Sequence, residues 1–318
     1  MKRLLCVLCG GPVRHLFSAR DYRRPVDRTE YSLNWCHNCE FGRLGGNFTP
    51  EAVQAYYDIA YYTHGSVSAA SNKATVWERL RCHLAWLADQ GVNFTPMELG
   101  APAERSVCDI GCGSGDNLEA LKNAGFHVVG IEPDAKARSL SVEIAEVFDG
   151  TAERLPPQIQ ARDFDIVLMS HVLEHCIDLR ATLTNVCSIL RPGGSVIIEV
   201  PNNAAKGFST FGAIWPWSDI PRHINFFTER SLSSLLHSYG LEISSVRYAG
   251  YFRQFAPDWI NTQKEIWAAI GTGSQPNFGL AAWLLLAQTA LTQRYRKYDS
   301  VRVHASRGRQ PIWGTPKT

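Results

Sequence analysis

The sequence predicts an α/β fold with a parallel sheet, preceded by a small cysteine-rich module. Three observations support this prediction. β-type runs alternate with helical patterns between residues 106 and 200, and regular alternation specifies a parallel sheet. A glycine-rich loop joins the first run to a helical pattern, as in nucleotide-binding α/β folds. Four cysteines near the N-terminus form two pairs with the spacing of metal ligands.

Length and composition are those of an ordinary folded protein with one large core and a smaller one. The chain has 318 residues, 45% of them hydrophobic and 19% charged. Single hydrophobic cores usually stop growing at about 250 to 300 residues, so a second, smaller core is expected. The net charge of +2 comes without a dense basic face, so we expect no nucleic-acid partner. The apolar run after Lys2 and Arg3 is too short for a signal peptide, and none reaches the roughly 18 residues of a membrane span. We therefore expect a cytoplasmic protein.

The two cysteine pairs, Cys6 with Cys9 and Cys36 with Cys39, are each C-x-x-C, and 26 residues lie between them. Four thiolates close a tetrahedral zinc site with no open position, so the predicted zinc is structural. The intervening stretch is long for a zinc ribbon, and we expect the hairpin from Tyr22 to Trp35 to carry an extended loop. The remaining five cysteines show no pairing pattern and are expected to be buried.

The glycine loop follows the run at residues 106–110, and its helical pattern stops at Gly125. Asp116 stands where a dinucleotide fingerprint needs its third glycine, and a carboxylate there would repel a pyrophosphate. This disfavours NAD. Asp109 instead offers a carboxylate at the strand end to a positively charged ligand, and S-adenosylmethionine carries such a charge. Glu132, after the run at 127–131, is placed to accept ribose hydroxyls.

Three further β-type runs follow, at residues 146–149, 165–169 and 195–200, with helical patterns between them. Together with the glycine loop, their connecting segments resemble the class I S-adenosylmethionine-dependent methyltransferases. The matching segments are residues 107–115, Glu132, residues 151–156, residues 171–175 and residues 190–194.

The resemblance covers about residues 50 to 305. It implies a Rossmann-like, seven-stranded sheet whose last strand, residues 299–305, is antiparallel and lies beside residues 241–248. It also implies that Thr151 and Ala152 lie against the adenine, although many members carry Asp at position 151. The cofactor-binding residues expected on this basis are Asp109, Gly111, Gly113, Gly115, Glu132, Pro133, Thr151, Ala152 and Ser170, with Tyr57 and Tyr62 as an N-terminal lid.

With its cysteine module, the chain is similar to a subgroup of zinc-containing methyltransferases, several of which act on deoxysugars or other small polar substrates. We therefore predict a zinc-ribbon module at residues 1–50 and a methyltransferase domain at 51–318, with a linker and lid at 51–100 and a Rossmann-like core at 101–305. The tyrosines near position 60 could equally pack between ribbon and core.

Methyl transfer to a neutral hydroxyl requires an aligned acceptor and removal of a proton. Because sites in open α/β sheets lie at the carboxyl ends of the strands, residues 170–175, 201–203 and 208–227 are expected to converge. In sugar-modifying relatives a Glu-His pair acts in base catalysis; His223 matches the histidine, and Arg222 replaces the glutamate. Other candidates are His171, Glu174 and His175. Alternatively, His223 satisfies backbone groups at a turn.

Two apolar segments are open to more than one interpretation. Phe208, Phe211, Trp215 and Trp217 could cover the acceptor or form a satellite core. Residues 280–291 predict a helix that is apolar nearly all round, which fits burial or a protein interface better than the membrane surface. Peripheral membrane contact through residues 280–297 is the alternative.

We thus predict a methyltransferase with S-adenosylmethionine as cofactor and structural Zn²⁺, acting on a small polar acceptor such as a sugar or a glycan-biosynthesis intermediate. An RNA methyltransferase with a zinc-ribbon recognition module is the nearest alternative; Ser170 to Leu173 stand where its N/D-P-P-Y/F/W motif would be. A non-catalytic zinc-ribbon interaction protein is the second alternative, but such a protein would not need the intact glycine loop. The acceptor, the methylated atom and the oligomeric state are not encoded in any motif.

Overall fold

The computed structural model describes residues 4–56, 75–89 and 93–308. The chain forms two compact units and passes between them several times. The ribbon unit comprises Met1–Asn93, Val200–Ser231 and Arg247–Val301, and the sheet unit comprises Phe94–Glu199, Leu232–Val246 and Arg302–Thr318. The domain boundary near residue 50 stays a prediction.

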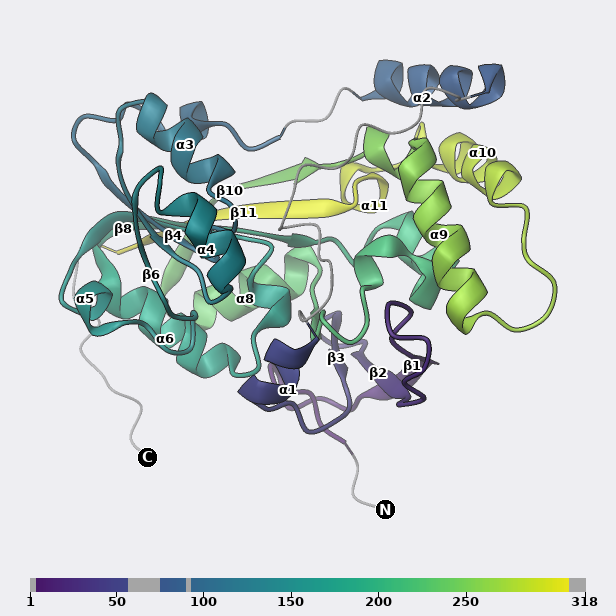
Figure 1. The fold of residues 1–318 in the computed structure, drawn as a ribbon, viewed down its shortest axis with the longest axis horizontal. Coiled ribbons are helices and arrows are strands. Elements are labelled where there is room, and N and C mark those ends of the chain that lie inside the picture. The colour runs from purple at the N-terminus through teal and green to yellow at the C-terminus, as the bar shows by residue number, and fades with distance from the viewer. Residues whose placement is uncertain (1–3, 57–74, 90–92, 309–318) are drawn as a thin grey trace. The chain divides into compact units, whose positions relative to one another are not determined.

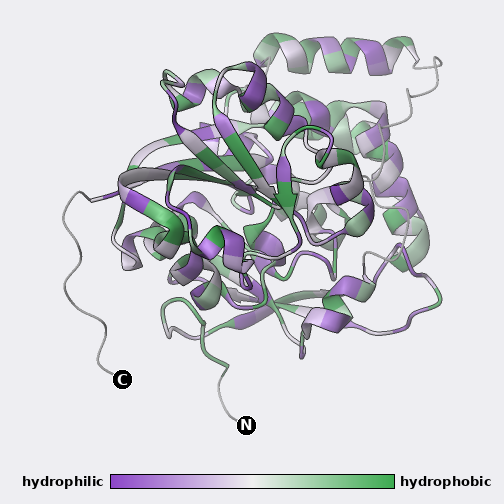
Figure 2. Ribbon diagram, turned by 60° about the vertical axis from the view of Figure 1, so that its left-hand side comes forward, coloured by the Kyte–Doolittle hydropathy of each residue, from purple (hydrophilic) through white to green (hydrophobic). Residues whose placement is uncertain are grey.

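The sheet unit is built on seven strands in the order β10-β11-β8-β7-β4-β5-β6 (Figure 1). Hydrophobic stretches run along these strands (Figure 2). The predicted α/β class is confirmed, as is the seven-stranded sheet with an antiparallel last strand lying beside the segment from Leu241. The strands are β4 (Ser106–Ile110), β5 (His127–Ile131), β6 (Glu146–Phe148), β7 (Phe164–Ser170), β8 (Leu190–Pro201), β10 (Leu241–Ala249) and β11 (Ser300–Arg307).

The strand order reverses at β4, and this reversal locates the site. β4 pairs in parallel with β5 on one side and with β7 on the other, so Asp109 lies opposite both Gly130 and Leu168. The strand is buried on both faces, with Val107 and Ile110 almost fully covered. In open parallel sheets, ligands bind outside the carboxyl ends of the strands at such a reversal. Asp109 lies at that end of β4.

Some helices of the sheet unit begin or end at capping residues that the sequence carries. Asp134 and Asp178 cap α4 and α6 by accepting backbone N–H groups of the first turn. The helix after the glycine loop ends before Gly125, whose φ of +95° suits glycine. These helices are α3 (Asp116–Asn123), α4 (Ala135–Ser141), α5 (Pro157–Gln160), α6 (Leu179–Ile189) and α8 (Glu229–Ser238), which begins in the ribbon unit.

The ribbon unit contains a four-stranded sheet in the order β1-β2-β3-β9. Its strands are β1 (Arg14–Ala19), β2 (Tyr31–Cys36), β3 (Phe41–Leu44) and β9 (Asn225–Phe226). The predicted extended loop is present at residues 20–30, but the first strand of the hairpin precedes Tyr22 instead of following it. The sequence did not indicate β9, because a two-residue strand far along the chain has no periodicity of its own.

Aromatic residues form the core beneath this sheet. Phe208 and Trp215 are buried together with Leu33, Trp35 and Phe226. The satellite-core interpretation therefore holds for Phe208 and Trp215, which are not free to cover an acceptor. The helices of the ribbon unit are α1 (Pro50–Ala55), α2 (Val76–Ala88), α7 (Lys206–Phe211), α9 (Pro257–Ile270), α10 (Phe278–Thr289) and α11 (Arg294–Lys297).

The apolar segment at 280–291 forms most of α10. Leu285 and Leu286 are buried in a cluster with Tyr251 and Phe255, whereas Leu280 and Leu284 are more than half exposed. One face of the helix is thus a core face. Among the described residues, no helix is long and apolar enough to cross a membrane.

Candidate functional site

In the glycine loop after β4, Gly111 is closely packed, whereas Gly113 has free space around it. The N–H of Gly111 donates to the carbonyl of Ile131 at 2.7 Å. A Cβ at Gly111 would lie 2.4 Å from Val172 Cγ2, so only glycine fits there. Gly113, with φ of +55°, would place a Cβ more than 4 Å from any other group. Its backbone is therefore approachable by a ligand.

Glu132 follows β5 and reaches back to this loop. Its Oε2 accepts the N–H of Gly113 at 2.8 Å, and its Oε1 accepts the N–H of Asp134 at the same distance. Burial raises the pKa of Glu132, while these two N–H donors act in the opposite direction. The carboxylate is thus fixed beside the glycine loop, where sequence reasoning placed a ribose ligand.

Asp109 is the most unusual group of the site. Its side chain is buried, and neither carboxylate oxygen has a hydrogen-bond partner among the described residues. Burial, followed by the negative charge of Glu132, raises the pKa of Asp109 to about 8. A buried polar group without a partner calls for an explanation. A cationic ligand such as S-adenosylmethionine would supply the missing partner, so these residues fit that cofactor.

The other predicted cofactor residues occupy neighbouring turns of the sheet unit. Thr151 Oγ1 accepts the N–H of Arg154 at 3.1 Å, so this side chain already serves its own turn. Ala152 is buried. Pro133 lies between Glu132 and the cap of α4, and Ser170 ends β7. Tyr57 and Tyr62, the predicted lid residues, lie outside the described residues.

His171, directly after β7, is held between two carboxylates. Its Nδ1 lies 3.1 Å from Glu174 Oε1, and its Nε2 lies 3.6 Å from Glu199 Oε1. Burial lowers the pKa of His171, but the two carboxylates outweigh this effect and raise it to about 9. The residue takes a positive φ of 56°. This geometry suits a fixed imidazolium better than a base that must release its proton.

The carboxylates around His171 belong to a larger buried network that sequence reasoning missed. Arg302 on β11 bonds both Glu199 and Glu98, with N–O distances of 2.6 Å in each pair. His304 Nε2 lies 3.2 Å from the other oxygen of Glu98. The signal in the sequence that could have indicated this network is the spacing of Arg302 and His304. They are two residues apart on one strand, so their side chains lie on the same face of the sheet.

His223 lies in the ribbon unit and is almost fully buried. Its Nδ1 donates to the carbonyl of Trp217 at 2.8 Å, and its ring stacks on the Trp217 indole at 6.2 Å between centroids. A carbonyl oxygen only accepts, so Nδ1 carries a proton and the neutral imidazole has its lone pair on Nε2. His223 thus makes a contact with a backbone carbonyl of its turn, as the alternative interpretation expected, and this contact leaves Nε2 as the nitrogen that can accept a proton.

The remaining predicted site residues divide between the two units. Glu174 is buried and His175 is half-buried, both in the sheet unit after β7. Residues 201–203 and 208–227 belong to the ribbon unit. The convergence expected of these segments joins the two units and stays a prediction.

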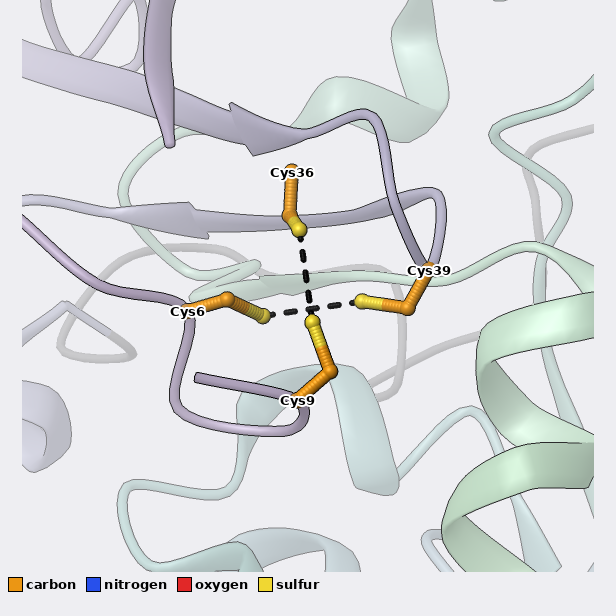
Figure 3. Close-up of side chains that lie close together, drawn as sticks. All are labelled: Cys6, Cys9, Cys36 and Cys39. Carbon is orange, nitrogen blue, oxygen red and sulfur yellow. Dashed lines mark hydrogen bonds between the residues drawn. The ribbon is translucent and has the colours of Figure 1, made fainter. Parts of the chain in front are cut away.

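The four N-terminal cysteines lie together and point toward one another (Figure 3). Cys6 Sγ is 3.6 Å from Cys39 Sγ, Cys9 Sγ is 3.5 Å from Cys36 Sγ, and all four sulfurs lie within 4.8 Å of one another. In a tetrahedral site with Zn–S bonds of about 2.3 Å, the sulfurs are about 3.8 Å apart. The cluster therefore fits the zinc ribbon that the spacing predicts.

The fold, the glycine loop and the unpartnered Asp109 together define a class I S-adenosylmethionine-dependent methyltransferase. Residues 78–246, 169 of the 318 residues, match a family described as a methyltransferase domain. The chain therefore belongs to this family. A Bacillus halodurans structure, that of a candidate methyltransferase, shares the fold with a TM-score of 0.50 at 15% identity, over 67% of this chain and 97% of that one.

Two relatives give a more particular likeness. A ubiquinone biosynthesis O-methyltransferase of Aromatoleum aromaticum is 30% identical over 162 residues, which are 47% of this chain and 69% of the relative. The human mitochondrial ubiquinone biosynthesis O-methyltransferase is 30% identical over 156 residues, 44% of this chain and 42% of the relative.

Proposed function

We propose that this methyltransferase transfers a methyl group from S-adenosylmethionine to a hydroxyl oxygen of a small molecule, with His223 as the base. The observation that carries the proposal is the hydrogen bond from His223 Nδ1 to the Trp217 carbonyl, because it leaves Nε2 as the basic nitrogen. The naming of both relatives as O-methyltransferases supports oxygen as the methylated atom.

Methylation of a hydroxyl requires loss of the hydroxyl proton and transfer of the methyl group from sulfur to oxygen. His223 Nε2 would take the proton of the acceptor hydroxyl, and the oxygen would then accept the methyl group, with S-adenosylhomocysteine as the leaving group. S-adenosylmethionine supplies the electrophilic methyl group. In the sheet unit, Asp109 would face the positive charge of the cofactor and Glu132 its ribose. Pro133, Thr151, Ala152 and Ser170 would complete the cofactor site.

A phenolic hydroxyl suits this base better than a sugar hydroxyl does. A phenol has a pKa near 10, about three or four units above that of an ordinary histidine, whereas an alcohol is much less acidic. The earlier expectation of a sugar acceptor has no support among the relatives. A structural Zn²⁺ held by the four cysteines is part of the same proposal, because their spacing and sulfur distances suit it.

A panel of acceptors tests the proposal. Purified protein is incubated with S-adenosylmethionine whose methyl carbon is isotope-labelled, and with catechol, a nucleotide-linked deoxysugar or transfer RNA in parallel. We expect S-adenosylhomocysteine release with catechol, and a product whose methyl carbon resonance is that of an O-methyl group. Methylation of the sugar at carbon, or of the RNA alone, would contradict the proposal.

A further inference from the structure

The segment that carries His223 belongs structurally to the zinc ribbon. The N–H of Leu44 in β3 donates to the carbonyl of Ile224, the residue after His223, at 2.9 Å. β3 then pairs with β9, and Arg43 Nη1 donates to Asn225 Oδ1 at 2.7 Å. Because β3 begins two residues after the last cysteine of the cluster, the backbone on one side of His223 is fixed by the ribbon itself.

Arg222, the residue before His223, is fixed from the same module. Its guanidinium forms a bidentate pair with Asp21, with Nη1 at 3.0 Å from Oδ2 and Nη2 at 2.9 Å from Oδ1. Asp21 lies in the loop between β1 and β2. Both side chains are at most 1% exposed. A buried fork of this kind fixes the guanidinium plane as well as its position.

The same guanidinium also holds the turn before His223. Arg222 Nε donates to Asp219 Oδ1 at 2.9 Å, and the Asp219 carbonyl accepts the N–H of His223 at 3.1 Å. Arg23, 3.5 Å from Asp219, brings the cluster to two positive and two negative charges. A charge-balanced cluster can remain buried, whereas loss of one member leaves an uncompensated charge.

We propose that Asp21 is a positioning residue for His223. Through Arg222 and Asp219 it fixes the turn in which His223 Nδ1 meets the Trp217 carbonyl, and so it determines where Nε2 points and which nitrogen is basic. The inference rests on the proposed function insofar as His223 is the base. It also gives Arg222 a role: the residue anchors the loop to the ribbon through Asp21.

The test uses the full-length protein with nitrogen-labelled histidine, and the variants Asp21→Asn and, as a matched control, Asp27→Asn. Asp27 lies in the same loop, and its Oδ1 accepts the N–H of Thr29, two residues away, at 2.9 Å. Nuclear magnetic resonance reports the tautomer and titration of His223, whose signals are assigned by their loss in His223→Ala. Turnover is measured with catechol and cofactor affinity by calorimetry.

We expect Asp21→Asn to reduce the Nδ1–H tautomer and shift the titration of His223, while His171 is unchanged. Turnover should fall by roughly tenfold to a hundredfold, the scale of an ångström misplacement, and cofactor affinity should stay the same. Asp27→Asn should change none of these. Should Asp21→Asn fail to fold, the double variant Asp21→Asn/Arg222→Gln, which removes both charges of the pair, takes its place.

Unchanged His223 signals in the variant would overturn the inference, whatever happens to turnover. Altered His223 signals together with wild-type turnover of catechol would show that Asp21 positions the ring without affecting catalysis, and would overturn the catalytic part of the inference. If His223→Ala is itself fully active, or catechol is not methylated, the proposed function fails, and the His223 signals alone then decide whether Asp21 positions the ring.

Discussion

Glu132 and Gly113 are joined by a hydrogen bond of 2.8 Å from the glycine N–H to the carboxylate. This bond connects the end of β5 to the loop that follows β4. A Cβ at position 113 would meet no other group within 4 Å. The same carboxylate accepts the N–H of Asp134. Glu132 therefore organises the loop before any ribose reaches it.

Substitution of Glu132 should weaken cofactor binding by removing charge-assisted hydrogen bonds. Each such bond contributes about 1.5 to 3 kcal/mol, so Glu132→Ala should raise the Kd for S-adenosylmethionine by about tenfold to over a hundredfold. Isothermal calorimetry measures this. Glu119→Ala, an exposed position on α3, is the control and should bind as the wild type does. Equal affinity in both variants would remove Glu132 from the site.

Asp109 should make cofactor binding depend on pH. Its folded pKa of about 8 means that the cofactor-free protein holds a proton there at neutral pH, and a cationic ligand favours its release. Affinity for S-adenosylmethionine should therefore rise by about tenfold per pH unit up to pH 8 and then level off. Calorimetry in buffers of different ionisation enthalpy should detect the released proton. A flat profile would contradict this.

The same shift predicts that Asp109→Asn stabilises the cofactor-free protein. The folded pKa is raised above the unfolded value of 3.8, so the stability contributed by this group is present below pH 3.8 and is lost as pH rises toward 8. The asparagine variant avoids that loss. Its thermal midpoint should exceed that of the wild type most at pH 8 and above, while its cofactor affinity falls. A lower midpoint at pH 8 would show that the carboxylate has a partner.

His171 should stabilise the fold within a defined pH window. Its pKa is raised from 6.5 to about 9, so its contribution is complete below pH 6.5 and is lost as pH rises through 9. The pKa of Glu199 is lowered from 4.5 to about 2, so its share is present above pH 4.5. His171→Gln should therefore cost roughly 1.5 to 3 kcal/mol of unfolding free energy between pH 4.5 and 6.5, and less above pH 9. Urea unfolding measures it, with exposed His127→Gln as the control.

The cysteine cluster should hold one zinc per chain. Cys36→Ser should lose the metal and unfold the ribbon with lowered solubility, since binding and folding of such modules are coupled. Affinity for S-adenosylmethionine should persist, because Asp109 and Glu132 lie in the sheet unit. Elemental analysis and calorimetry test both parts, with Cys187→Ser as the control. Protein without zinc and with its cysteines oxidised in pairs would contradict the assignment.

The sheet unit was largely predictable because its signals are local. Alternating β-type and helical runs predicted the strands to within five residues, the largest difference being β8, which begins at Leu190 instead of residue 195. The glycine loop together with Asp109 and Glu132 pointed to the cofactor. β4 lies in parallel between β5 and β7 and is buried on both faces, as strands of parallel sheets usually are.

The ribbon's fourth strand and the pair between Asp21 and Arg222 were not predictable. They join residues about 200 positions apart, and neither a two-residue strand nor a single charged residue in a loop carries a periodic signal. The network around Arg302 was not predictable either. Asp21, Arg222 and Arg302 look like ordinary surface charges in the sequence, but each is buried against a partner far along the chain.

If His223 removes the acceptor proton, the turnover of His223→Ala, measured beside its cofactor affinity, shows this most directly. We expect an unchanged Kd for S-adenosylmethionine, turnover lowered by roughly a hundredfold to ten-thousandfold, and loss of the acidic limb of the pH profile. His237→Ala, an exposed position on α8, should behave as the wild type does. A fully active His223→Ala, with His175→Ala inactive, would contradict the account and move the base to the segment after β7.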